Sequence, residues 1–142
     1  MAEQARNTLS NAREWATVGA TIYVTTHSPG RSHIPVTKGE VTRVTATTFV
    51  VTTSKGVEHR FQFSSLRAGA KMDGRVHLTH HQAHPEDDPM LPALIRAHNR
   101  YMATRRAHRR FDAWAESPSP QTREAAIEAL QALRQFDPPA PE

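Results

Sequence analysis

Arginines gather between residues 96 and 110 of this chain, with a spacing that could grip phosphate groups. A guanidinium group presents planar N–H donors that fit a phosphate or a carboxylate in a bidentate way. Phe111 and Trp114 follow directly, and aromatic rings beside arginines suit stacking on nucleic-acid bases. We expect Arg31, in an earlier loop, to add a contact. The candidate nucleic-acid ligands on the helix are Arg96, Arg100, Arg105, Arg106, Arg109 and Arg110.

Two other interpretations fit the same arginines. They can be solvated and paired with acidic residues of the last predicted helix, or they can dock on an acidic protein partner. On a helix with about 100° per residue, Arg105 and Arg109 extend an apolar stripe, whereas the other four occupy about a third of the circumference. The predicted helix therefore begins with an apolar face and ends with arginines on most sides.

Histidines form a second group over residues 77–84, which read HLTHHQAH and precede three carboxylates. In a helix, His77, His81 and His84 would share one face, and two histidines four residues apart are a known zinc spacing. We place His77 and His80 at the end of a strand, which breaks that geometry. We therefore expect no metal and interpret these histidines as exposed linker residues. A pH-sensitive patch is the alternative, because histidine changes charge near neutral pH.

No arrangement of residues indicates catalysis. The six glycines are scattered, so there is no Gly-rich phosphate loop, and no G-x-S-x-G sequence occurs. Serine, histidine and aspartate are present, but no spacing nominates a triad. The chain has no cysteine, which excludes disulfides and thiolate chemistry. We expect a protein that is not an enzyme and has no cofactor.

The composition allows one ordinary domain, or one small domain with a helical extension. The chain has 142 residues, of which 37% are hydrophobic and 6% aromatic, and its net charge is +4 with histidines neutral. A modest core is therefore expected. The polar start of the chain does not resemble a signal peptide. No apolar run approaches the roughly 20 residues that a membrane span needs, so we expect a cytoplasmic protein without membrane contact.

Short strand patterns separated by turns fill the first half of the chain. Gly39 is expected to bend the second strand, and Gly56 suits the positive φ of a hairpin turn. After the fourth strand we expect one helical turn over residues 64–67 and a last strand at about residues 75–79. The four earlier strands are predicted at Thr21–Thr26, about Val36–Thr45, Thr48–Thr53 and Val57–Phe63.

This strand order resembles the SH3-like small barrels, including the KOW-type modules of transcription and translation factors and small barrel proteins encoded by actinobacterial phages. The resemblance covers about residues 18–80. It rests on Val18-Gly19-x-x-Ile22-Tyr23-Val24, on Gly39-Glu40-Val41, on Phe49-Val50-Val51 and on Arg60-Phe61. It implies a binding platform rather than a catalyst, although a fold alone does not set a function.

Around the barrel we expect an N-terminal segment over residues 1–17, in which Trp15 packs as a lid, and a linker over residues 81–89. A helical hairpin or arm should follow over residues 90–136, with helices at about 90–116 and 120–136. Asp88 and Ser119 are the predicted N-caps, each followed by proline at the first helical position. Residues 137–142 should be disordered.

The last predicted helix carries apolar residues at spacings of three and four, a one-sided stripe that must be buried somewhere. It can fold back on the preceding helix, pack on the barrel or meet another copy of the chain. The candidate partner-binding residues are Ile127, Leu130, Leu133 and Phe136.

The sequence therefore predicts an α+β protein, a small barrel followed by two helices. We expect it to bind nucleic acid, or a protein of a nucleoprotein complex, through its arginine-rich helix. The alternative is a phage-type interaction module that docks on a host protein or self-associates through its C-terminal helices.

Overall fold

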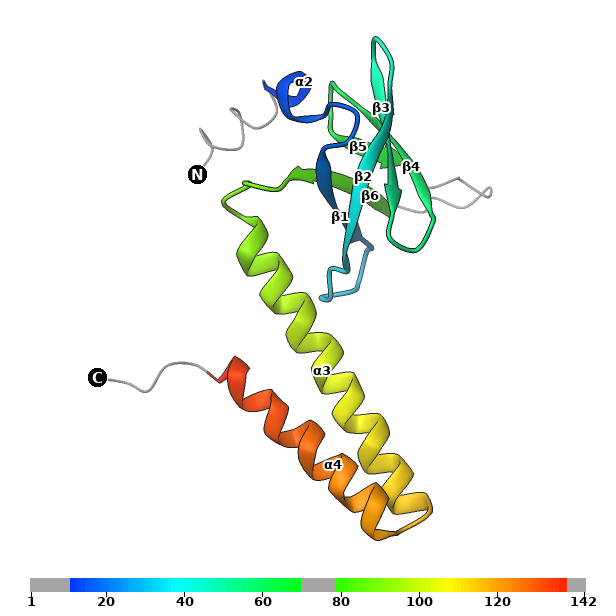
Figure 1. Cartoon of the computed structure of the whole chain (residues 1–142), viewed down its shortest axis with the longest axis vertical. Helices are drawn as coiled ribbons and strands as arrows, with labels where there is room; N and C mark the ends of the chain where they lie inside the picture. Colours follow the sequence, from blue (N-terminus) through cyan, green and yellow to red (C-terminus); the bar gives the residue numbers. More distant parts are fainter. Residues whose placement is uncertain (1–10, 70–78, 138–142) are drawn as a thin grey trace, which may run out of the picture. The chain divides into compact units, whose positions relative to one another are not determined.

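The structure is a computed structural model that describes residues 11–69 and 79–137. The chain divides into two compact units, residues 1–94 and residues 95–142 (Figure 1). The first unit contains a six-stranded antiparallel sheet, and the second contains most of one long helix and a shorter helix beside it. The predicted α+β class, a barrel followed by two helices, is confirmed.

Six strands and three helices are described in these residues. The first three strands agree with the predicted ranges to within one residue, and the fourth is one residue shorter at each end. The elements are α2 (Ala12–Trp15), β1 (Thr21–His27), β2 (Val36–Val44), β3 (Thr48–Thr53), β4 (Glu58–Gln62), β5 (Arg67–Gly69), β6 (His80–Pro85), α3 (Leu91–Glu116), α4 (Pro120–Ala132) and the 3₁₀ turn η1 (Leu133–Phe136).

The sheet has the strand order β4-β3-β2-β1-β6-β5 and is nearly closed. Its two edge strands, β4 and β5, are consecutive in the chain and are joined by a tight turn over residues 63–66. Leu66 adopts a left-handed φ of 56° there, and its side chain is buried. A non-glycine residue in this region is unusual, and the buried side chain holds it in place. The turn therefore brings the two edges together.

The core follows the alternation of the strands, in which every second side chain faces inward. Ile22 and Val24 on β1, Phe49 and Val51 on β3 and Phe61 on β4 are all buried. The rings of Phe49 and Phe61 lie 5.4 Å apart, centroid to centroid. This cluster gives the small sheet a continuous apolar interior.

A bend in β2 allows the sheet to curl around that core. The β2–β3 register shifts between Val41 and Arg43, which is a β-bulge. At Gly39 the two strands approach so closely that a Cβ atom would lie 2.7 Å from Cγ1 of Val51 and 2.9 Å from the carbonyl oxygen of Thr52. The irregularity predicted at Gly39 lies further along β2, at the bulge between Val41 and Arg43, while Gly39 allows the close approach of the two strands because it has no side chain.

Residues 81–85 correct one of the sequence predictions. They were expected to begin a linker, but they form most of β6, which pairs with β1 on one side and β5 on the other. β5 was not predicted either. The strand expected at residues 75–79 lies outside the described residues, except Thr79, which precedes β6.

The short helix α2 confirms the predicted position of Trp15. Its indole ring meets the Phe49 ring edge-on, with centroids 6.0 Å apart. Asn11 stands at the N-cap, while the first ten residues lie outside the described part. Trp15 therefore covers the apolar interior, as expected of a lid.

The predicted start of α4 is confirmed, whereas α3 begins later than predicted. Ser119 caps α4 and forms a reciprocal capping box with Thr122, and Pro120 takes the first position. At α3 the Asp88 carboxylate accepts a hydrogen bond from the Met90 N–H at 2.9 Å. The helix itself begins at Leu91, two residues later than a cap at Asp88 followed by Pro89 would place it.

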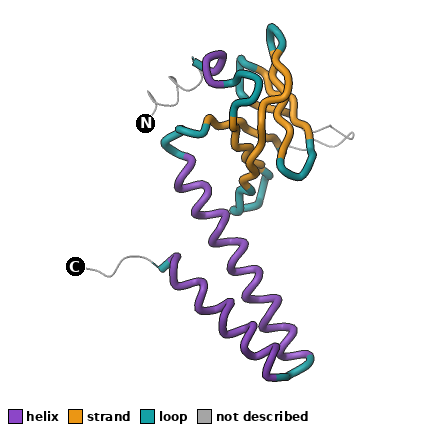
Figure 2. The backbone as a smooth tube through the Cα atoms, viewed as in Figure 1, coloured by secondary structure: helices purple, strands orange, loops and turns teal. Residues whose placement is uncertain are grey.

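Within the second unit, α3 and α4 run side by side in opposite directions (Figure 2). The residues buried in their contact are alanines, namely Ala107 on α3 and Ala126 and Ala129 on α4. Larger residues of the hairpin, such as Trp114, Leu133 and Phe136, are half-buried. The tail predicted to be disordered begins with Asp137, which is described; the rest of it lies outside the described residues.

A search of the described helices for a membrane-spanning segment finds none that is both long enough and apolar enough.

The close approach at Gly39 makes Gly39→Ala a test of the curl. The added methyl group collides with Val51 and the Thr52 backbone, so we expect a loss of about 1–3 kcal/mol in the free energy of unfolding. Denaturant unfolding monitored by tryptophan fluorescence measures it. Lys38→Ala, at the adjacent exposed position, is the control and should change stability by less than about 0.5 kcal/mol. Equal stability of Gly39→Ala and the wild type would show that β2 has room to relax.

Candidate functional site

The structure separates the six predicted arginine ligands into two sets. Ala107 marks the side of α3 that faces α4. At about 100° per residue, Arg105 and Arg109 lie roughly 160° from it, on opposite sides, and Arg106 about 100° from it. All three are exposed. The remaining three lie within about 60° of Ala107, on the side of α4: Arg96, Arg100 and Arg110.

On the side facing α4, one arginine makes contacts within the hairpin, while Arg100 is exposed. Arg96 donates a hydrogen bond of 3.1 Å to the carbonyl oxygen of Gln135, and its guanidinium lies 5.8 Å from the centroid of the Phe136 ring. Arg110 is half-buried. Arg96 therefore helps to hold the end of α4 and is less available to a ligand than the sequence suggests.

The outward arginines have no acidic partner among residues 11–69 and 79–137. The ion pairs described there are His84–Asp88 and Arg123–Glu124, and neither involves α3. Arg105 lies over the Tyr101 ring at 5.8 Å. The expected pairing of these arginines with acidic residues of the last helix is therefore not seen in the described residues. Arg105, Arg106 and Arg109, which we call the outward arginines, remain open to an anionic partner.

The apolar stripe predicted on α4 is only partly covered. Ile127 is 41% exposed and Leu130 is 53% exposed, whereas Leu133 and Phe136 are half-buried. The contact with α3 instead uses the alanines on the neighbouring side of the helix. Ile127 and Leu130 thus form an exposed apolar pair.

Histidines on β1 and β6 lie in a hydrogen-bonded network that the sequence did not predict. The Asp88 carboxylate contacts Nδ1 of His84 at 2.8 Å, and Nε2 of His84 contacts the Thr25 hydroxyl at 2.8 Å. The same hydroxyl contacts Nε2 of His27 at 2.9 Å. His84 is buried, so the expectation of exposed linker histidines is wrong for this residue.

With His84 neutral and the Thr25 hydroxyl donating to it, rather than to the Gln82 carbonyl oxygen at 3.5 Å, the network has one direction of donation. A carboxylate only accepts, so Nδ1 of His84 carries the proton that it donates to Asp88. In neutral His84, Nε2 is then an acceptor and receives the Thr25 O–H. The Thr25 oxygen in turn accepts from Nε2–H of His27. Nδ1 of His27 is therefore the nitrogen left to take up an added proton.

The order of carboxylate, imidazole and hydroxyl matches that of a hydrolytic triad. A nucleophile must reach its substrate, however, and Thr25 is fully buried, with an exposure of 0%. The hydroxyl also lies between two imidazole rings, which leaves no approach for a carbonyl carbon. We therefore interpret this network as structural: it satisfies the polar groups of a strand pair that carries few apolar residues.

A second pair of histidines lies on the other side of β6. His81 and His59 of β4 have ring centroids 4.3 Å apart, and His59 also borders the Phe61 ring at 6.1 Å. Nδ1 of His81 contacts the Thr26 hydroxyl at 3.0 Å. Burial lowers the pKa of both His59 and His81 below the ordinary value of 6.5, and their mutual repulsion lowers that of His81 further.

His81 and His84, the two metal candidates that the structure describes, do not share one face. His81 pairs with Thr26 and His84 pairs with Tyr23, so they point to opposite faces of β6. His77 lies outside the described residues. Within 11–69 and 79–137, no group of three or more histidine or acidic residues could hold a metal ion.

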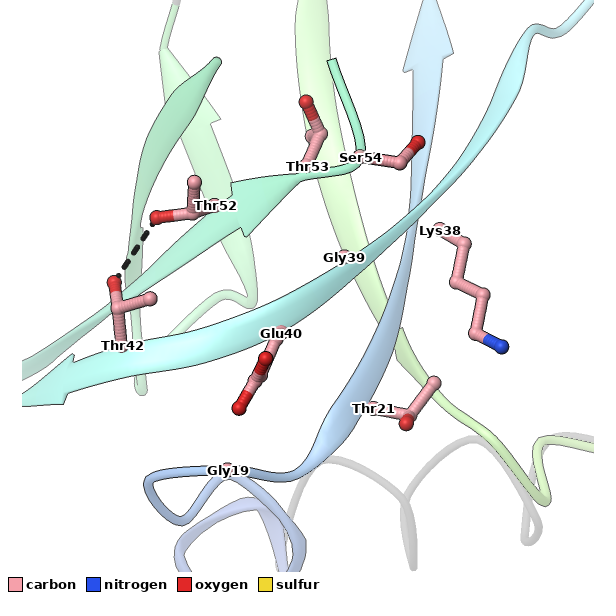
Figure 3. A pocket seen from close by; sticks show the side chains of 9 residues that line it. All are labelled: Gly19, Thr21, Lys38, Gly39, Glu40, Thr42, Thr52, Thr53 and Ser54. Carbon is pink, nitrogen blue, oxygen red and sulfur yellow. Dashed lines mark hydrogen bonds between the residues drawn. The ribbon is translucent and has the colours of Figure 1, made fainter. Parts of the chain in front are cut away.

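A polar groove of about 520 Å³ crosses the start of β1, β2 and the end of β3 (Figure 3). Lys38 and Glu40 project from β2 beside it, and the Thr42 and Thr52 hydroxyls are joined by a hydrogen bond of 3.1 Å at one end. The groove offers hydroxyls and two opposite charges without an aromatic ring. Nothing in it indicates a nucleophile or a paired acid and base.

Arg31, the predicted loop contact, is exposed in a turn between β1 and β2. Its N–H donates to the Ser28 carbonyl oxygen at 3.3 Å, and Gly30 supplies a positive φ of 72°. It belongs to the first unit, whereas the six other candidate arginines belong to the second.

No protein-family model, curated protein or solved structure matches this chain. The resemblance to SH3-like barrels therefore stays a prediction, and the functional assignment depends on the side chains themselves.

The network residues were missed because β6 is polar. Alternating apolar residues identify a strand, and residues 80–85 contain only Ala83 and Pro85 as apolar groups. A usable signal did exist, since His80, Gln82 and His84 alternate along one face. Thr25 lies in the first predicted strand, but the sequence did not identify it as a buried member of the network.

The lowered histidine pKa values predict that acid destabilises the barrel. Burial lowers the pKa of His27, His59 and His81, so the unfolded chain binds protons near pH 6.5 while the folded chain does not. Stability is therefore complete above about pH 7 and falls as the pH drops below 6.5.

Urea unfolding at about pH 7.5, 6.5 and 5.5 measures this decline. The His59→Gln variant, which removes one titrating ring, should lose less stability over the same range than the wild type. A free energy of unfolding that stays constant or rises toward pH 5.5 would contradict the assignment.

Proposed function

We propose that the chain is a non-enzymatic nucleic-acid-binding protein, or a component of a nucleoprotein complex, that contacts phosphates through the outward arginines. The observation that carries this proposal is that Arg105, Arg106 and Arg109 lie together on the exposed side of α3 without a carboxylate within ion-pair distance among the described residues. Three unpaired guanidinium groups within about one helical turn repel one another, and an anionic partner relieves that repulsion.

The chemistry of arginine favours phosphate as that partner. Guanidinium groups bind phosphate in a bidentate manner, and releasing counterions from nucleic acid adds a favourable, salt-dependent contribution. Phe111 is 52% exposed on the same helix and lies 5.9 Å from the Trp114 ring. On the helix, Phe111 lies about 40° from Ala107, about 120° from Arg105 and about 160° from Arg109. Stacking of an unpaired base on this ring would therefore add a contact on a different side of α3.

The barrel supports the same class of function. Its small, nearly closed six-stranded sheet agrees with the proposed likeness to SH3-like modules, which serve as binding platforms. Within the described residues, no accessible nucleophile or metal cluster supports a catalytic function. We therefore assign the barrel a binding role beside α3.

Replacing the outward arginines tests the proposal. In an Arg105→Gln/Arg106→Gln/Arg109→Gln variant, we expect binding of labelled single-stranded and duplex DNA and of RNA to weaken strongly at low salt. Each lost phosphate contact should make the slope of log affinity against log salt less negative by about 0.7 to 0.9, or roughly 2 to 3 in total. Fluorescence anisotropy across a salt series measures both quantities.

The matched control is Arg123→Gln/Arg134→Gln, which removes one exposed arginine from α4 and one from η1. It should change the salt slope by less than the triple variant does. Circular dichroism establishes that both variants keep their helices. If the wild type fails to bind any nucleic acid at low salt, or if the triple variant keeps the wild-type slope, the assignment to the outward arginines is wrong.

A second candidate function rests on the exposed pair Ile127 and Leu130. Two branched apolar side chains that are 41% and 53% exposed indicate a surface that can be buried on association. This supports the alternative of a module that self-associates through its C-terminal helices or docks on another protein. The two functions are compatible, since the outward arginines and this pair are on different helices.

Self-association predicts a concentration-dependent mass that depends on this pair. Ile127→Gln/Leu130→Gln should shift the protein toward monomer in sedimentation equilibrium at micromolar concentrations, because it removes the apolar area that association would bury. Val44→Gln/Val57→Gln is the control, since it changes two exposed valines of the first unit. If the wild-type protein stays monomeric at all concentrations, self-association is wrong, and docking on a different protein is the remaining function for this surface.

A further inference from the structure

One face of the sheet carries imidazole and guanidinium groups from three strands. His27 lies directly opposite His80, Thr25 opposite Gln82 and Arg67 opposite Gln82 in the strand register. Cross-strand partners share a face, and so do alternate residues of one strand. His27, His80, His84 and Arg67 therefore lie on one side of the sheet, which we call the imidazole face.

Two histidine rings of the imidazole face lie nearly parallel. The His27 and His80 rings lie 4.9 Å apart with an angle of 9° between their planes. His27 is further fixed by its hydrogen bond to the Thr25 hydroxyl, which is itself fixed by His84 and Asp88. The imidazole face is therefore positioned by the buried network before any ligand arrives.

The charges that act on His27 are all cationic. His80, His84 and Arg67 lower its pKa, in addition to the larger effect of burial. Other titratable groups around this face are Tyr23, opposite His84, and Asp88, which already contacts His84 and the Met90 N–H. Behind the sheet lie His81 and His59, which are also imidazoles. Among residues 11–69 and 79–137, the groups that act on His27 include no carboxylate that could balance a proton on it.

We propose that the imidazole face is a binding site for phosphate groups, with His27, His80 and Arg67 as its ligands. The anion supplies negative charge that the described residues of this cluster do not provide to His27. Arg67 contributes a permanent cation, His80 contributes a ring N–H donor, and His27 contributes one at Nδ1 once that nitrogen is protonated. This site is separate from the outward arginines and does not depend on the function proposed for them.

Binding at this face is coupled to proton uptake. The donation pattern leaves Nδ1 of His27 to accept a proton, and an adjacent phosphate stabilises the resulting imidazolium. Because coupling is reciprocal, the anion raises the proton affinity of His27, and acid raises the affinity for the anion. Affinity should therefore increase as the pH falls from about 7.5 to 5.5.

Histidine-ring NMR spectra of the full chain test the site. Inorganic phosphate and a thymidine trinucleotide are the two probes, added at matched ionic strength against sodium chloride. Saturable shifts of the His27 and His80 signals are expected with at least one probe. The probe that produces them shows whether the ligand is free phosphate or a nucleic-acid backbone. No saturable shift at either ring with both probes would overturn the proposal.

The trinucleotide also tests proton coupling, because its phosphodiester charges do not change between about pH 5.5 and 7.5. Affinity should be at least about fivefold tighter at the lower pH, and the titration midpoint of His27 should move upward when the probe is present. If the trinucleotide binds equally at both pH values, the coupling to His27 is wrong.

Arg67→Gln should weaken binding of the preferred probe about tenfold, since a charge-assisted contact is lost. Arg43→Gln, an exposed arginine on β2, is the matched control and should bind as the wild type does. If Arg67→Gln fails to fold, His80→Gln serves in its place and should lose the same binding. Unchanged affinity in a folded Arg67→Gln or His80→Gln variant would overturn the site.

The same titration in the Arg105→Gln/Arg106→Gln/Arg109→Gln background separates the two proposals. Shifts at His27 and His80 should persist there. Their loss would assign phosphate binding to α3 and overturn this proposal, while supporting the function proposed for the outward arginines.

Discussion

The curl of β2 is the constraint on which the first unit depends. At Gly39 the strand lies so close to β3 that no side chain fits, and the bulge between Val41 and Arg43 turns the strand further. A flat sheet of these short strands could not enclose Phe49 and Phe61. β1 pairs with β2 on one side and with β6 on the other, and this second pairing places the β6 histidines.

The polar strand β6 is stable between β1 and β5 because hydrogen bonds replace the apolar contacts that it lacks. β6 contributes Ala83 and Pro85 to the interior, and its remaining side chains are polar. The Thr25 hydroxyl satisfies two imidazoles at once, and Asp88 satisfies His84 while it also holds the Met90 N–H beside the start of α3. A buried network of this kind must be complete, since an unpartnered polar group would cost about 1–3 kcal/mol.

Much of the fold could be predicted from the sequence because its strands and caps have local signals. β-Branched residues alternate in β1 and β3, Gly39 lies near the bulge of β2, and Ser119-Pro120 begins α4. The sheet edge could not be predicted in the same way. β5 has three residues, too few for a period, and β6 lacks the apolar alternation that identifies a strand. Its stability comes from partners distant in sequence, such as Thr25 and His84, which only the register brings together.

The residues of the candidate sites could be predicted where they are exposed, but not where packing within the fold covers them. Composition identifies the arginines of α3, but the contact with α4 decides which of them are available. Ala107, Ala126 and Ala129 are buried in the hairpin, while Leu133 and Phe136 are half-buried and Arg96 contacts the end of α4. No ion pair described in residues 11–69 and 79–137 joins the two helices. The outward arginines and the exposed Ile127–Leu130 pair are therefore available for contacts with other molecules.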